Sequence, residues 1–191
     1  MIGITDRSAL IVVDMQRDFC EGGALPVKGC SSLVPVINSY IDIFRGLGRL
    51  VIASRDWHPP NHSSFKEFGG PWPPHCVQGS EGAEFHPELR LPPDAVIISK
   101  ADTPEKEAYS AFDNTELHYI LTKAGVRRVF VCGVATDYCV KHTAKDALEL
   151  GYEVVILRDA VAAVDPAEGE KVLRELVKAG AVVASSGDIL K

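Results

Sequence analysis

Short apolar segments alternate with amphipathic segments along this chain, and the alternation constrains its fold more than any other feature. The apolar segments are continuous, which is typical of strands buried on both faces. Such strands belong to parallel sheets that are covered by helices on both sides. The sequence therefore predicts a Rossmann-like, three-layer α/β fold, with six parallel strands at 9–13, 50–53, 95–99, 129–131, 153–157 and 181–184.

The amphipathic segments predict the covering helices. The last one has the clearest start, because Asp165 can cap it, Pro166 can take the first position and Glu168 can complete a capping box. Ser31 and Ser32 could cap the first helix in the same way, and Asn114 the second. Gly48, Gly125 and Gly180 are the expected stop signals, and the helices are predicted at 33–47, 115–124, 138–150 and from 166 onward.

Length, net charge and cysteine content limit the number of domains and the kinds of partner that this chain can have. The 191 residues predict one domain over 1–191, and the net charge of -6 leaves no basic surface for a nucleic acid. No apolar run approaches the roughly 18 residues that cross a bilayer, so we expect no membrane partner. The N-terminus lacks the basic start of a signal peptide, and five cysteines without a CxxC pair argue against a disulfide framework. A reducing, cytoplasmic location is therefore predicted.

Ionisable or nucleophilic residues follow several of the predicted strands. In parallel sheets the ligands bind at the carboxyl ends of the strands, near the point where the strand order reverses. Groups that finish separate strands should therefore meet in space. The residues in such positions are Asp14, Asp56, Lys100, Cys139 and Asp159.

The segment VFVCGVATDYCVK, residues 129–141, predicts a strand, a turn at Gly133 and a helix with Cys139 in its first turn. The positive end of a helix stabilises an anion. A free cysteine has a pKa of about 8.5, and a helix start and a cation can lower it by several units. Cys139 is thus a candidate nucleophile, although a free cysteine is commonly a small buried apolar residue.

Asp14 and Lys100 would complete a nucleophile set with Cys139. Asp14 could accept the thiol proton, and Lys100 could stabilise the thiolate and hold Asp14 in place. Taken singly, Asp14 could be an exposed loop carboxylate and Lys100 a surface lysine with a buried stem. Their joint position at strand ends favours the catalytic interpretation.

Asp56, His58 and His75 form a candidate metal site. An aspartate and a histidine two residues apart in an extended segment project to the same side. One carboxylate with two imidazoles suits Zn²⁺, Fe²⁺ or Mn²⁺ and leaves positions open for water and substrate. His62 and Ser64 are possible further ligands. The alternative is a set of ordinary polar residues in the irregular region from 57 to 93.

Several motifs together resemble a known family. The chain resembles the cysteine hydrolases of the isochorismatase-like superfamily, and within it the nicotinamidases, also called pyrazinamidases. The resemblance covers nearly the whole chain. It rests on ALIVVDMQRDFCEGGALPV at 9–27, SRDWHPPNHSSF at 54–65, WPPHCVQGSEGAEFHP at 72–87, AVIISKAD at 95–102 and VCGVATDYCVKHTAKDA at 131–147.

The resemblance assigns roles to the candidate residues. It implies a catalytic triad of Cys139, Asp14 and Lys100, and a divalent metal on Asp56, His58 and His75. It also implies a cis peptide bond between Val134 and Ala135, which would turn the Ala135 N–H, with that of Cys139, toward the developing oxyanion.

The fourth metal position is left open by the resemblance. Some members place a histidine six residues after the first metal-site histidine. Ser64 stands there in this chain, and the histidine is at His62. Ser64 binding through a water molecule would match other members, and His62 is the less favoured choice.

The implied activity is the metal-dependent conversion of nicotinamide to nicotinate and ammonia through a thioester, as part of NAD salvage, with pyrazinamide as a further substrate. Zinc is the expected metal, with iron or manganese as alternatives. Phe19, Trp72 and Tyr109 are the candidate aromatic walls of a flat pocket. A homo-oligomer is left open.

Two rival functions remain at this point. Another amidohydrolase of the superfamily would act on a carbamoyl or ureido group, and Arg17 or Arg55 could then bind a substrate carboxylate. A binding module without catalysis is the second rival, since a fold does not fix a function. Loss of the cysteine, lysine or aspartate would mark such a module, and all three are present.

Overall fold

Six parallel strands form the central sheet of this computed structural model, which describes residues 1–190. The spatial order is β4-β3-β2-β5-β6-β7, and this confirms the predicted sheet. The strands are β2 (Ser8–Val13), β3 (Leu50–Asp56), β4 (Val96–Lys100), β5 (Arg128–Val134), β6 (Glu153–Ala162) and β7 (Val182–Ala184).

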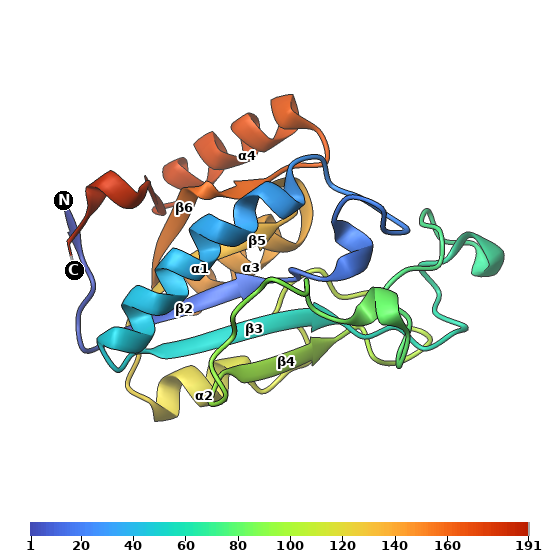
Figure 1. Cartoon of the computed structure of the whole chain (residues 1–191), viewed down its shortest axis with the longest axis horizontal. Coiled ribbons are helices and arrows are strands. Elements are labelled where there is room, and N and C mark those ends of the chain that lie inside the picture. The colour runs from blue at the N-terminus through green and yellow to red at the C-terminus, as the bar shows by residue number, and fades with distance from the viewer. Residues whose placement is uncertain (191) are drawn as a thin grey trace.

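Helices cover both faces of the sheet, as Figure 1 shows. Successive residues of a strand point to opposite faces, so each strand contributes to two cores. In β2, Leu10 and Val12 pack in the core beneath α1, whereas Ile11 and Val13 pack with the helices of the opposite face. The first face carries α1 (Cys30–Gly46), and the second carries α2 (Leu117–Lys123), α3 (Lys141–Glu149) and α4 (Pro166–Lys178).

The strand order reverses between β2 and β5. The chain runs outward from β2 through β3 to β4, and then returns to β5 on the other side of β2. Gly133 lies inside β5 at this point, and the expected strand break at Gly133 is therefore wrong. A Cβ on Gly133 would lie 2.1 Å from the Val13 carbonyl oxygen, so the glycine permits the close approach of β5 to β2.

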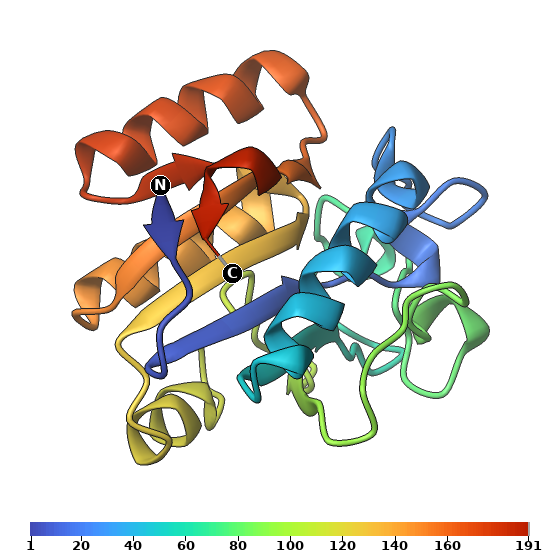
Figure 2. The same ribbon diagram turned by 60° about the vertical axis from the view of Figure 1, so that its left-hand side comes forward.

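The chain ends meet beside the sheet in an arrangement that the sequence did not indicate. β1 (Ile2–Gly3) pairs in parallel with β8 (Ile189–Leu190), and Figure 2 shows the two ends close together. The irregular segments between β3 and β4 gather at the end toward which the strands point (Figure 1). Short helical turns in the chain are η1 (Arg17–Phe19), η2 (Lys66–Phe68), η3 (Glu81–Ala83), η4 (Thr136–Val140) and η5 (Ser186–Asp188).

Helix α1 begins earlier than the sequence predicted. It starts at Cys30, after Gly29 in the left-handed conformation, and Ser31 does not cap it. The carboxylate of Glu21 accepts hydrogen bonds from the backbone N–H groups of Gly29 at 2.8 Å and Ser31 at 3.0 Å. A side chain from the preceding loop thus satisfies the free donors of the helix start.

Cys20 and Cys30 form a single disulfide, which the sequence analysis did not predict, since it argued only against a framework of several disulfides. The odd number of cysteines excluded a fully paired set, but it did not exclude a single pair. Cys30 is also the first residue of α1. The disulfide ties the start of α1 to the segment that follows η1.

The predicted cap of α4 is confirmed, whereas that of α2 is wrong. Asp165 caps α4 as predicted and accepts from the N–H groups of Ala167 and Glu168, although the Glu168 side chain faces Lys171 and does not return a bond. Helix α2 begins at Leu117, and Asn114 does not cap it. Within residues 1–190, no helix is long and apolar enough to cross a membrane.

Candidate active site

Cys139, Asp14 and Lys100 lie together at the carboxyl end of the sheet. Asp14 follows β2, Lys100 ends β4 and Cys139 lies in the η4 turn after β5. The Lys100 ammonium lies 2.9 Å from an Asp14 carboxylate oxygen and donates to Cys139 Sγ at 3.5 Å. Cys139 Sγ also lies within 4.8 Å of an oxygen of Asp14. Asp14, Lys100 and Cys139 therefore meet at one end of the sheet, as their positions after separate strands predicted.

The environment of Cys139 differs from the expected helix start. Residues Thr136–Val140 form a π-helical turn, and α3 begins after it, at Lys141. Burial raises the pKa of the Cys139 thiol well above its ordinary value, although Lys100 acts in the opposite direction. The expectation of a lowered thiol pKa is therefore wrong for this structure. A fully buried thiol needs a neighbouring base to remove its proton.

Asp14 is placed to be that base. Burial raises the pKa of Asp14, and the Lys100 charge opposes the rise. Ser54, on the neighbouring strand β3, donates its hydroxyl to Asp14 Oδ1 at 2.8 Å. Ser54 is a supporting residue that the sequence analysis missed. This bond fixes one carboxylate oxygen and leaves the other facing Lys100.

Asp56, His58 and His75 gather within 4.8 Å of one another, measured between their candidate ligand atoms. The Nε2 atoms of His58 and His75 lie 4.0 and 3.9 Å from Asp56 Oδ2. Each Nδ1 atom contacts a backbone carbonyl, His75 O at 2.9 Å for His58 and Pro73 O at 2.8 Å for His75. Such contacts orient both rings with Nε2 toward the carboxylate, as second-sphere partners of metal-binding histidines do.

One atom of the metal set, by which we mean Asp56, His58 and His75, has no hydrogen-bond partner among the described residues. His58 is fully buried, and its Nε2 has no hydrogen-bond partner among the described residues. A buried polar atom without a partner costs free energy unless a ligand satisfies it. One carboxylate and two imidazoles with free Nε2 atoms fit a divalent cation. The residues present therefore suit a metal ion.

Asp56 belongs to both groups of residues. Its Oδ1 lies 2.5 Å from the Lys100 ammonium, while Oδ2 faces the two histidines. Burial alone would raise the pKa of Asp56, but the charges of Lys100 and His58 lower it overall. The carboxylate thus links the nucleophile set to the metal set.

His62 and Ser64 bond to each other beside the metal set. Ser64 Oγ lies 2.7 Å from His62 Nδ1, and the Ser64 N–H also donates to this nitrogen. His62 Nε2 lies 3.0 Å from the Lys106 carbonyl. Both ring nitrogens of His62 are therefore engaged, which leaves none free for a cation.

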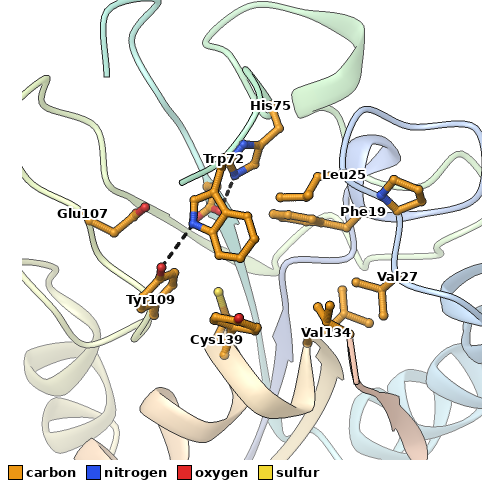
Figure 3. Close-up of a pocket in the computed structure, with 14 residues that line it drawn as sticks. Phe19, Leu25, Val27, Trp72, His75, Glu107, Tyr109, Val134 and Cys139 are labelled. Atoms are coloured by element: carbon orange, nitrogen blue, oxygen red, sulfur yellow. Dashed lines mark hydrogen bonds and ion pairs between the residues drawn. The ribbon is translucent and has the colours of Figure 1, made fainter. Parts of the chain in front are cut away.

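A cavity opens above Cys139, and Figure 3 shows its walls. The predicted aromatic residues Phe19, Trp72 and Tyr109 all line it. Trp72 donates its indole N–H to the Tyr109 hydroxyl at 3.2 Å. The remaining lining residues are Leu25, Pro26, Val27, Asp56, His75, Glu107, Val134, Ala135, Tyr138, Cys139 and Val164.

Glu107 and Tyr138 are cavity residues that the sequence analysis missed. Tyr138 lies next to the nucleophile, and its ring contacts Trp72 at a centroid distance of 5.3 Å. Its position beside Cys139 was the available signal. Glu107 lies in an irregular segment after β4, where no periodic pattern indicates which residues point inward.

The peptide bond between Val134 and Ala135 is cis, and both residues line the cavity. Asp159, by contrast, is absent from the cavity lining. It accepts hydrogen bonds from the Tyr40 hydroxyl at 2.8 Å and the Ser186 N–H at 3.0 Å. The prediction that every strand-end group meets at one site is therefore wrong for Asp159.

The two arginines considered as substrate ligands are engaged elsewhere. Arg17 pairs with Glu81 at 3.1 Å. The Arg55 guanidinium lies 3.8 Å from the centre of the Trp57 ring and donates to Ser99. Within residues 1–190, no arginine lines the cavity.

The fold and these residues define the class of protein to which the chain belongs. Residues 8–188 match the isochorismatase domain, and the chain belongs to this family. The resemblance inferred from the sequence is thereby confirmed, and the family identifies the chain as a hydrolase.

Several of the similar proteins within this family are nicotinamidases or pyrazinamidases. The chain is 41% identical to the nicotinamidase of Escherichia coli strain K12, over 94% of this chain and 95% of that protein. It is 55% identical to the pyrazinamidase of Pyrococcus horikoshii, solved in complex with zinc, with a TM-score of 0.92 over 94% and 99% of the two chains. It is 44% identical to PnC1 of L. infantum, solved in complex with nicotinate, with a TM-score of 0.92 over 99% of this chain and 98% of that chain.

Proposed function

We propose that this chain hydrolyses nicotinamide to nicotinate and ammonia, and that it also accepts pyrazinamide. The observation that carries the proposal is a cavity that Cys139 shares with Asp56 and His75 of the metal set, between aromatic walls. The cavity is lined mainly by apolar and aromatic side chains, which suits a flat, uncharged ring. The relatives named above include a nicotinamidase, a pyrazinamidase and a protein solved with nicotinate, which supports the choice of substrate.

The first chemical step uses the nucleophile set. Asp14 takes the Cys139 proton, and the thiolate attacks the amide carbon of the substrate. The resulting oxyanion is stabilised by the N–H groups of Ala135 and Cys139. Lys100 holds Asp14 in place and offsets the negative charge that forms beside it.

The second step releases the products. Asp14 returns its proton to the leaving ammonia, and a thioester on Cys139 remains. Asp14 then removes a proton from a water molecule, and the resulting hydroxide attacks the thioester carbon. The carbon–sulfur bond breaks, Asp14 returns the proton to the Cys139 sulfur, and the released acid ionises to nicotinate. Phe19, Trp72 and Tyr109 hold the ring flat throughout and exclude other water.

Asp56, His58 and His75 would hold a divalent cation, for which zinc is our choice because a similar pyrazinamidase was solved with it. When bound, the cation supplies a Lewis acid that can orient the pyridine nitrogen and polarise a water molecule. Ser64 could contribute through water, since its oxygen keeps lone pairs after donating to His62. By the same resemblance, the reaction would serve NAD salvage. The cytoplasmic location, which was inferred from cysteine usage, stays a prediction.

The rival substrate class is disfavoured by the cavity lining. A carbamoyl or ureido substrate with a free carboxylate requires a cationic partner, and arginine is the usual one. Within the described residues the cavity wall contains neither Arg17 nor Arg55. The apolar and aromatic lining favours an uncharged ring.

The direct test is ammonia release from nicotinamide by the purified protein, before and after removal of metal with a chelator. We expect release that is lost on chelation and restored by added zinc. Release that ignores chelation would contradict the role of the metal. Absence of ammonia with every divalent metal tried would overturn nicotinamide as the substrate.

A further inference from the structure

Glu107 lies beside the metal set, on the side that opens to the cavity. Its side chain is 27% exposed, and Oε1 lies 3.7 Å from the unpartnered Nε2 of His58. The same oxygen accepts a hydrogen bond from the Ala108 N–H at 3.0 Å, which fixes the carboxylate. Figure 3 shows Glu107 pointing toward the centre of the cavity. The resemblance gave this residue no role.

The charges around the metal set are unevenly paired. Lys100 lies against both Asp14 and Asp56, so the ammonium already neutralises part of the charge that Asp56 offers to a cation. Glu107 has no lysine or arginine partner within residues 1–190, and its neighbour Lys106 pairs with Asp113 at 2.7 Å. Within residues 1–190, Glu107 is thus a carboxylate next to the metal-site histidines that neither a lysine nor an arginine neutralises.

The distances place Glu107 in the outer sphere of the site. The candidate ligand atoms within 4.8 Å of one another are those of Asp56, His58 and His75, and Glu107 falls in a neighbouring group with His58 and His62. His62 has no free nitrogen for a cation, as described above. Two atoms bound to one zinc ion lie at most about 4.4 Å apart, since each bond is about 2.0–2.2 Å long. Glu107 does not share a group within 4.8 Å with Asp56 and His75, so it cannot bind the same ion directly together with both of them. Glu107 can therefore contact a cation held by Asp56, His58 and His75 through a water molecule.

We propose that Glu107 is an outer-sphere carboxylate of the divalent-metal site, which accepts a hydrogen bond from a water on the cation and raises the affinity for that cation. The inference rests on the metal site of the proposed function, but not on its substrate. Outer-sphere partners of metal sites are worth 10- to 100-fold in metal affinity when they are removed.

The test measures zinc affinity without substrate, by competition with a chromophoric chelator. Glu107→Gln keeps an oxygen for the Ala108 N–H and removes the charge, so it isolates the electrostatic contribution. We expect it to bind zinc roughly 10- to 100-fold more weakly than the unmodified protein. Glu105→Gln, at an exposed position in the same segment, is the matched control and should bind zinc with unchanged affinity.

Several outcomes would overturn the inference. Equal zinc affinity in Glu107→Gln and Glu105→Gln would do so, and so would a protein that binds no zinc. A lowered unfolding temperature of metal-free Glu107→Gln would assign the residue a structural role instead. Ammonia release is measured separately, so a protein that binds zinc through Glu107 but leaves nicotinamide intact would contradict the substrate and support this site.

Discussion

At the scale of single residues, Lys100 pairs with the two buried carboxylates of the site. Its ammonium is fully buried and lies against two carboxylates, Asp14 and Asp56. A buried charge is tolerated where opposite charges compensate it. Lys100 therefore has a structural function, the compensation of two buried carboxylates, in addition to its place beside Cys139.

Lys100→Met should destabilise the metal-free protein by about 3 kcal/mol or more, because it leaves two buried carboxylates without their cation. The free energy of unfolding from urea titrations measures the loss. Lys106→Met is the control, since its partner Asp113 is exposed and such pairs contribute about 1 kcal/mol or less. Equal losses in the two variants would contradict the compensating role of Lys100.

The sequence predicted the site residues on strands better than those on loops. Asp14, Asp56 and Lys100 were found because each finishes a strand of a parallel sheet, and the fold fixes where strands end. Glu107 was missed because its segment follows no periodic pattern. The pKa of Cys139 was mispredicted because the sequence does not reveal how deeply a residue is buried.

At the scale of elements, the start of α1 depends on a side chain outside the helix. Glu21 binds the N–H groups of Gly29 and Ser31, and these bonds, those from Ser31 first, lower the pKa of Glu21 to about 2. A carboxylate at a helix start is also favoured by the helix dipole. The loop before α1 thus supplies the cap that Ser31 was expected to supply.

Glu21→Gln should lower the free energy of unfolding by about 0.5–1 kcal/mol at pH 6, since it removes a charged cap. The pKa of Glu21 is lower in the folded chain than its ordinary value of 4.5. Its contribution is therefore present above pH 4.5 and is lost as the pH falls toward 2. The difference between the two proteins should shrink over this interval in urea titrations at successive pH values.

Glu88→Gln provides the matched control, because the Glu88 side chain is exposed and has no ion pair within residues 1–190. Its unfolding free energy should track that of the unmodified protein at every pH. A gap between Glu21→Gln and the unmodified protein that stays constant from pH 6 to pH 2 would contradict the capping account.

The helix starts show where local sequence decides structure. At α4 the cap, the proline and the helix follow one another in the chain, and Asp165 caps the helix as predicted. At α1 the cap comes from a residue nine positions before the helix, so no short motif reveals it. The π-helical turn at Thr136–Val140 was likewise not predicted, because its sequence resembles that of an ordinary helix start.

At the scale of the whole molecule, the alternation of strands and helices was enough to predict the sheet. The apolar strands pack beneath α1 on one face of the sheet and beneath α2, α3 and α4 on the other face. The pairing of β1 with β8 was not predicted, because each strand has two residues and carries no periodic signal. The order reversal beside β2 places the nucleophile and the metal set at one end of the sheet.

At this end of the sheet, Cys139 is the proposed nucleophile of nicotinamide hydrolysis. Nicotinate formation by Cys139→Ala, assayed beside Cys132→Ala, tests it most directly. Cys132 is a fully buried core cysteine on β5, so its variant controls for the loss of a buried thiol. We expect Cys139→Ala to remain folded and to lose roughly 10⁴-fold or more in rate, whereas Cys132→Ala retains most of its activity. Comparable activity in the two variants would contradict a covalent mechanism on Cys139.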